Sequence, residues 1–267
     1  MALDVIKWDL LECESARGIT VPHGFTTRLG GVSQGIFDSL NLGVHRGDDP
    51  ANVAENYRRL GLALGFDPRQ AVLAHQVHGD RVRAVTAADC RGLDHRAYPE
   101  CDALVTNTAG VALVVFTADC TPILLYDPVT GAVGAAHAGW RGTAADIAGK
   151  TVKAMEEAFG CRPEDICAAI GPNIGHCCFQ TDVDVPFALA QCYGKDAVKA
   201  FIRPAGDKYY VNLKGINALS LSQAGVKHIE LSGSCTVCQS SRFWSHRATR
   251  GQRGAQAGII VCKEGQK

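Results

Sequence analysis

The spacing of hydrophobic and polar positions changes along the chain and predicts a mixture of strands and helices. Residues 111–117 form an unbroken apolar run, VALVVFT, which is typical of a strand buried on both faces. Helices are predicted at residues 52–64, with Asn52 as N-cap, and at residues 143–159, 184–193 and 215–224. Strands are predicted near residues 71–79, 81–85, 166–170, 209–213 and 227–231. This mixed order, which includes a hairpin, favours an α+β fold over a regular βαβ series.

The hairpin is predicted from the sequence DPVTG at residues 127–131, which separates two apolar segments. A proline in the second position and a closing glycine are typical of a tight turn between antiparallel strands. If Tyr126 pairs with Gly131, the same register places Cys120 opposite His137 at the open end of the hairpin. We therefore expect these two side chains to meet.

Composition limits the class of protein. The chain has 267 residues, of which 46% are hydrophobic, and its 27 Lys and Arg balance its 27 Asp and Glu. This balance argues against a nucleic-acid partner, because phosphate neutralisation needs a basic excess. No apolar run approaches the roughly 20 residues that span a bilayer, and the first residues lack the pattern of a signal peptide, so we expect a cytoplasmic protein without a membrane partner. Without linkers or repeats, residues 1–267 are expected to form a single domain.

The twelve cysteines are the unusual feature of this composition. In a reducing compartment most of them are expected to be buried thiols that fill the core. The chemical candidate is the set His78, Cys120 and His137, because two imidazoles and one thiolate suit a borderline-soft divalent metal. Three protein ligands leave a position open for water, as a catalytic zinc site requires. Two other roles stay open for these residues: packing, or a Cys120 nucleophile with His137 as its base.

The remaining cysteine motifs are weaker candidates. His228 and Glu230, followed by Cys235 and Cys238, superficially resemble the HxE and CxxC parts of a zinc deaminase. The spacing is too short, no proline precedes Cys235, and no second CxxC completes a structural zinc site. The adjacent residues at 177–178 are poorly suited to bind one ion tetrahedrally. We expect all of these to be ordinary buried or loop thiols.

Three polar side chains in glycine-bounded segments could bind an anion. Arg28 lies in TRLGG, Asn41 in SLNLG, and Arg141 in GWRG, just before a predicted helix. No segment matches the Walker or dinucleotide-binding fingerprints, so ATP and NAD are not indicated.

Several motifs together resemble the YfiH family, also called multicopper polyphenol oxidase, laccase-like or purine nucleoside phosphorylase. They are HGFTTRLGGVS at residues 23–33, SLNLG at 39–43, QVHG at 76–79, TADCTP at 117–122, AHAGWRG at 136–142, and residues 170–178. The resemblance implies an α+β fold with α/β/β/α layers and mixed sheets. It also implies that His78, Cys120 and His137 form a metal-binding active site.

The resemblance implies a zinc-dependent enzyme for phosphorolysis of adenosine, inosine and methylthioadenosine and for hydrolytic deamination of adenosine. Its small-molecule partners would be a nucleoside and phosphate, with Arg28, Asn41 and Arg141 as candidate binding residues, in a monomer or homodimer. Zn²⁺ is the expected metal, and Cu²⁺ is also a candidate. Where many relatives have RDGxTGR, this chain reads RATRGQR, so the role of the basic segment, residues 242–253, stays open.

Other functions remain alternatives to the nucleoside enzyme. One is a cysteine- or metal-dependent amidohydrolase that edits peptidoglycan precursors. Another is a copper-dependent polyphenol oxidase, although the chain lacks the paired His-x-His sequences that a trinuclear copper centre needs. A third, non-enzymatic alternative is metal storage by the surplus thiols.

Overall fold

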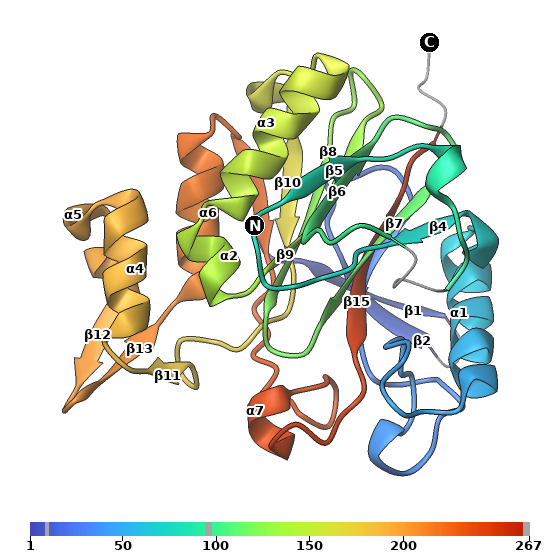
Figure 1. Ribbon diagram of the computed structural model, residues 1–267, viewed down its shortest axis with the longest axis horizontal. Helices are drawn as coiled ribbons and strands as arrows, with labels where there is room; N and C mark the ends of the chain where they lie inside the picture. The colour runs from blue at the N-terminus through green and yellow to red at the C-terminus, as the bar shows by residue number, and fades with distance from the viewer. Residues whose placement is uncertain (9–10, 94–97, 264–267) are drawn as a thin grey trace.

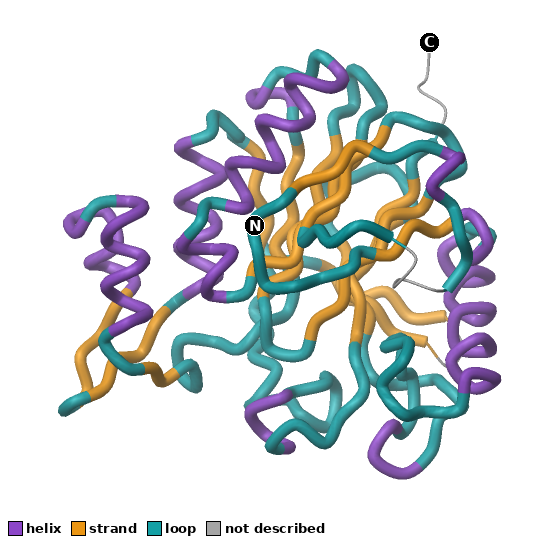
Figure 2. The backbone as a smooth tube through the Cα atoms, viewed as in Figure 1, coloured by secondary structure: helices purple, strands orange, loops and turns teal. Residues whose placement is uncertain are grey.

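The computed structural model describes residues 1–8, 11–93 and 98–263, in which two six-stranded sheets pack against each other (Figures 1 and 2). The first sheet has the order β1 (Asp4–Trp8), β2 (Leu11–Ser15), β3 (His23–Thr26), β15 (Gln256–Val261), β7 (Ala112–Thr117), β4 (Ala71–Leu73). The second has the order β14 (His228–Leu231), β10 (Cys167–Ile170), β8 (Thr121–Tyr126), β9 (Val133–Ala138), β6 (Ala103–Thr106), β5 (Val82–Ala84). Both sheets contain parallel and antiparallel pairs.

A smaller sheet and the helices complete the fold. The third sheet has the order β11 (Gln180–Thr181), β13 (Lys208–Val211), β12 (Ile202–Ala205). The α-helices are α1 (Pro50–Leu64), α2 (Trp140–Ala144), α3 (Ile147–Phe159), α4 (Asp184–Tyr193), α5 (Lys195–Val198), α6 (Leu213–Gln223) and α7 (His246–Thr249). Among the helices of the described ranges, none could span a membrane.

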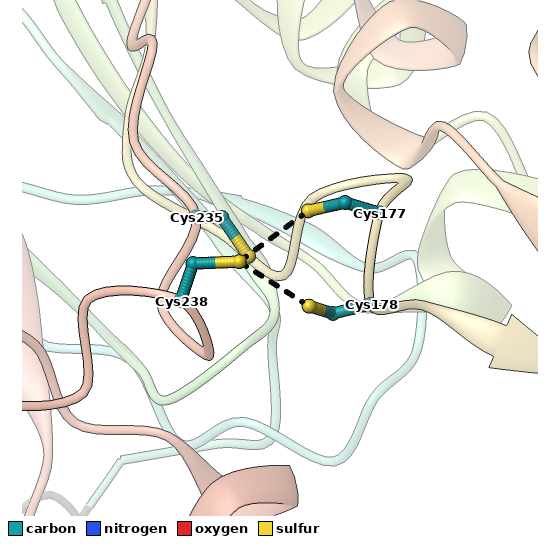
Figure 3. Close-up of side chains that lie close together, drawn as sticks. All are labelled: Cys177, Cys178, Cys235 and Cys238. Carbon is teal, nitrogen blue, oxygen red and sulfur yellow. Dashed lines mark hydrogen bonds between the residues drawn. The ribbon is translucent and has the colours of Figure 1, made fainter.

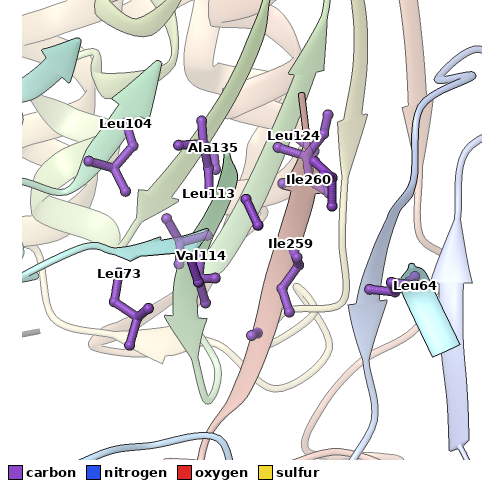
Figure 4. Close-up of a cluster of buried hydrophobic side chains, with 14 of the residues drawn as sticks. Leu64, Leu73, Leu104, Leu113, Val114, Leu124, Ala135, Ile259 and Ile260 are labelled. Carbon is purple, nitrogen blue, oxygen red and sulfur yellow. The ribbon is translucent and has the colours of Figure 1, made fainter. Parts of the chain in front are cut away.

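The largest hydrophobic core lies between the two large sheets. Leu113 of β7, Leu124 of β8 and Ile260 of β15 are fully buried in it (Figure 4). All six residues of β7 are buried, as expected for its unbroken apolar run. Helix α1 contributes its apolar face to this core, whereas α3 and α6 pack on the second sheet in a separate cluster. The predicted α/β/β/α layering is confirmed.

Two helix boundaries differ from the sequence-based expectation. Helix α1 begins at Pro50, and its N-cap is Asp49, whose Oδ1 accepts a hydrogen bond from the Ala51 N–H at 2.9 Å. Asn52 therefore lies inside the helix, because Asp-Pro is the better start signal. The predicted helix at residues 143–159 is divided into α2 and α3 at Asp146, which has a left-handed φ of 60°. Helix α2 starts at Trp140, so Arg141 lies within a helix and not before one.

The hairpin between β8 and β9 is present, but its predicted register is wrong by two residues. Tyr126 pairs with Val133, not with Gly131, and Pro122 pairs with His137. The turn is wider than predicted because Asp127 forms two hydrogen bonds within it. Its side-chain Oδ1 accepts the Val129 N–H at 2.8 Å, and the backbone carbonyl of Asp127 accepts the Gly131 N–H at 2.9 Å. A shift of two residues keeps every side chain on its original face of the sheet. The prediction that Cys120 and His137 lie near each other is therefore unaffected by the error in register.

Candidate metal centre and active site

Three segments place the residues of the candidate site. His78 lies in the loop after β4, Cys120 in the turn between β7 and β8, and His137 on β9. The loop after β4 is held beside β7 by Gln76, whose amide accepts the Phe116 N–H at 2.6 Å and donates to the Phe116 carbonyl at 2.8 Å. The Gln76 side chain thus continues the hydrogen bonding between β4 and β7 beyond the end of β4. The sheet in this way fixes the start of the loop that carries His78.

The ligand atoms of His78, Cys120 and His137 all lie within 4.8 Å of one another. The two imidazole rings meet edge to face, with their centroids 4.9 Å apart. A Cβ atom on Gly139 would lie 3.1 Å from His78 Cδ2 and 3.3 Å from the Cys120 sulfur, so a side chain here would crowd two of the three site residues. The three residues, called the His-Cys-His site below, offer donors that fit a divalent transition metal.

Asp102 supports this site and was not identified from the sequence. Its Oδ1 lies 2.8 Å from His137 Nδ1, and its carboxylate also accepts the backbone N–H groups of residues 77, 78 and 79 at 2.8–3.1 Å. One fully buried carboxylate therefore orients one histidine and holds the loop that carries the other. The only signal in the sequence is an acid at the start of an apolar strand, which many structural aspartates share.

The electrostatics of the site favour a thiolate next to an imidazolium. Burial acts to raise the pKa of Cys120, but the charge of His137 and hydrogen bonds from both histidines outweigh it and lower this pKa to about 6. Burial acts to lower the pKa of His137, but Cys120 and Asp102 raise it to about 9. The pKa of Asp102 lies below its ordinary value, because the interaction with His137 and the loop N–H groups exceeds the effect of burial. Cys120 is thus prepared as an anionic ligand or nucleophile.

The site opens into a cavity of about 330 Å³. Phe116 and Phe179 provide aromatic lining, and Arg46 and Arg253 provide positive charge. Burial and the proximity of Arg46 lower the pKa of Arg253 to about 10, and the buried Nε of Arg253 has no hydrogen-bond partner. His246, Arg247 and Arg253 all come from the basic segment, whose role was left open by the sequence. The positive charges of these two arginines repel each other, and this repulsion favours binding of an anion in the cavity.

The three polar residues expected to bind an anion are not among those that line this cavity. Arg28 donates to the carbonyl oxygens of Asp38 and Ser240 and stacks 4.0 Å above the Trp244 ring. Asn41 is fully buried, and its Oδ1 accepts the N–H groups of residues 43 and 255. Arg141 is exposed, 4.3 Å from the Trp140 ring. A direct role in phosphate binding stays a prediction for all three.

Two groups of side chains in the described part of the chain could hold a metal ion. One is the His-Cys-His site. The other consists of Cys177, Cys178, Cys235 and Cys238, which the sequence alone predicts to be ordinary buried or loop thiols. Neither group contains the several histidines that a trinuclear copper centre would need.

The family model described as "Multi-copper polyphenol oxidoreductase laccase" matches residues 22–263. The chain belongs to this laccase-like YfiH family. Among curated members of the family, the purine nucleoside phosphorylase YlmD of Geobacillus stearothermophilus is 41% identical over 247 residues, which is 90% of each chain. The purine nucleoside phosphorylase YfiH of Escherichia coli is 39% identical over 222 residues, which covers 83% of this chain and 86% of that one.

Solved structures of the YfiH family have the same fold. The crystal structure of YlmD from Geobacillus stearothermophilus matches with a TM-score of 0.89 at 38% identity, over 97% of this chain and 98% of that one. A Bacillus licheniformis hypothetical protein YfiH matches with a TM-score of 0.91 at 35% identity, over 98% and 99%. The expected family and fold class are confirmed.

Proposed function

We propose that this chain is a zinc-dependent purine nucleoside phosphorylase that also deaminates adenosine. The observation that carries the proposal is that the His-Cys-His site and the Arg46–Arg253 pair face one cavity. A cavity of about 330 Å³ lies in the range that accommodates small ligands. Curated relatives at about 40% identity that are named purine nucleoside phosphorylases support the same reaction class.

Phosphorolysis requires phosphate next to the anomeric carbon of the nucleoside. Arg46 and Arg253 would bind the phosphate, since its negative charge relieves their mutual repulsion and the free Nε of Arg253 gains an acceptor. Phe116 and Phe179 would pack against the purine ring. Phosphate and nucleoside held in one cavity react at a high effective concentration. A phosphate oxygen forms the bond to C1′ of the ribose as the glycosidic bond breaks, and the products are ribose 1-phosphate and the free purine, which takes up a proton.

His78, Cys120 and His137 would hold the Zn²⁺ ion. When bound, the ion supplies Lewis acidity and lowers the pKa of its water toward neutrality, which suits hydrolytic attack on the adenine ring. Asp102 would keep the Nδ1 proton of His137 in place, which leaves Nε2 free to serve as the ligand atom. The Asp102 carboxylate also keeps the loop of His78 from moving away.

Purified protein incubated with inosine, with and without phosphate, tests the proposal. We expect hypoxanthine and ribose 1-phosphate only when phosphate is present, and no turnover by Cys120→Ala. Cys192→Ser, a substitution of an exposed thiol in α4, is the matched control and should keep full activity. Base release that is independent of phosphate, or that matches the Cys120→Ala level, would contradict phosphorolysis. Release of ammonia from adenosine tests the deaminase activity separately.

The alternative amidohydrolase is favoured by one observation, the low pKa of Cys120 beside a histidine that is oriented by Asp102. In this arrangement Cys120 would be the nucleophile, His137 the base and Asp102 the acid that orients the base. Cell-wall precursor peptides are the substrates to test. Hydrolysis that survives exhaustive chelation but stops after alkylation of Cys120 would support this function over the zinc enzyme.

A further inference from the structure

Two loops that are about 60 residues apart in the sequence bring four cysteines together. Cys177 and Cys178 lie in the loop between β10 and β11, and Cys235 and Cys238 lie in the loop between β14 and α7 (Figure 3). Their sulfur atoms all lie within 4.8 Å of one another. The Cys238 sulfur lies 3.7 Å from that of Cys177 and 3.5 Å from that of Cys178. These residues are called the four-cysteine cluster below.

We propose that the four-cysteine cluster binds one structural Zn²⁺ ion. Tetrahedral zinc with Zn–S bonds of about 2.3 Å separates its sulfur ligands by about 3.8 Å, which agrees with the spacing to Cys238. Four thiolates are the donor set of closed structural zinc sites. An iron–sulfur cluster fits less well, because it holds its cysteines further apart around several metal atoms. Four thiols lose their protons to solvent when the ion binds.

The two loops are preformed around this position. The backbone N–H of Gly175 donates to the Cys235 sulfur at 3.2 Å, as the outer hydrogen bonds of a metal-bound thiolate do. A Cβ atom on Gly175 would lie 3.1 Å from the Cys177 sulfur and 3.3 Å from the Cys235 sulfur, so glycine lets the backbone come this close. A metal held by four thiolates carries excess negative charge, and the ammonium group of Lys214 lies nearby. The Lys214 ammonium group donates hydrogen bonds to the carbonyl oxygens of Ser232 and Ser234, which shortly precede Cys235 in the chain.

The loop between β10 and β11 lines the active-site cavity with Ile174 and Phe179, and both loops bond to Asp119 in the wall of this cavity. Ile174 donates its N–H to the Asp119 carbonyl at 2.9 Å, and the Thr236 hydroxyl donates to Asp119 Oδ1 at 2.6 Å. Asp119 Oδ2 also accepts the Arg247 N–H at 2.7 Å. Asp119 directly precedes Cys120 and has a φ of 91°, which a non-glycine residue adopts only when its surroundings hold it there. Zinc in the cluster would therefore stabilise the turn that carries Cys120 without taking part in the reaction.

Metal content of the purified protein tests this proposal without reference to activity. After growth with zinc, we expect Cys238→Ser to contain about one zinc equivalent less per chain than the wild type by mass spectrometry of the metal. Cys192→Ser should retain the wild-type content. Cys120→Ala should lose the other equivalent, and X-ray absorption at the zinc edge of this variant should show four sulfur ligands. This last measurement does not depend on whether Cys238→Ser folds.

Two results would overturn the proposal. One is a zinc-edge spectrum of Cys120→Ala without a four-sulfur environment, or the absence of zinc from that variant. The other is a disulfide between residues of the two loops in the protein isolated under non-reducing conditions, detected in linked peptides. Neither result depends on nucleoside turnover, so failure of this proposal is distinguishable from failure of the proposed function.

Discussion

Asp102 Oδ1 lies 2.8 Å from Nδ1 of His137, and both side chains are buried. The same carboxylate accepts three N–H groups from the loop of His78. One acid thus joins two strands and a loop that are separated in the sequence, and it determines which ring nitrogen of His137 faces Cys120. Ligand orientation by such an acid is a common determinant of metal affinity.

Asp102→Asn is therefore expected to weaken zinc binding at the His-Cys-His site by about 10- to 100-fold. The amide has nearly the same shape but loses the charge and one acceptor position. Competition with a zinc chelator measures the affinity, preferably in a Cys238→Ser background that removes the second proposed site. Asp80→Asn, which removes an exposed partner of Lys150, is the control and should leave the affinity unchanged.

Alkylation of Cys120 in the metal-free protein should depend on pH with a midpoint near 6. The thiolate is the reactive form, so the rate should be low below this pH and rise as pH increases through it. His137→Gln removes the positive partner and should move the midpoint upward, toward the range of an ordinary thiol. Peptide mass spectrometry separates Cys120 from the other cysteines. A wild-type midpoint at or above pH 8 would contradict the thiolate–imidazolium pair.

Arg253→Met should raise the KM for phosphate by more than about 10-fold, because a charge-assisted contact contributes about 1.5–3 kcal/mol. The KM for the nucleoside should change less, since the arginine is assigned to the anion. Arg141→Met is the matched comparison, because Arg141 lies outside the cavity lining. A larger effect of Arg141→Met than of Arg253→Met on phosphate KM would favour the binding residues expected from the sequence.

Leu113→Ala should lower the free energy of unfolding by about 2–5 kcal/mol, because it leaves a cavity between the two large sheets. Leu62→Ala in α1 is the control, since this leucine is 73% exposed, and its effect should stay within about 0.5 kcal/mol. Denaturant unfolding measures both changes. Equal destabilisation by the two substitutions would contradict the assigned core.

Much of the local structure was predictable because it depends on neighbouring residues. The apolar run of β7 determines a strand buried on both faces, and α4 has the predicted bounds, Asp184–Tyr193. The start of α1 was predicted less well, because the signal at Asp49 and Pro50 competes with the one at Asn52. The hairpin was predicted with a shifted register, because side-chain bonds of Asp127 decide the size of its turn.

The sequence by itself also determined the candidate ligands His78, Cys120 and His137, because their chemistry and their positions at strand ends are visible in the motifs. Only the tertiary structure decided their orienting acid, Asp102, and brought the basic segment to the cavity. It also brought the two cysteine pairs together, although neither pair has a recognisable metal motif alone. These relationships join residues that are far apart in the chain, and packing of the sheets and their loops, not local propensity, sets which distant side chains become neighbours.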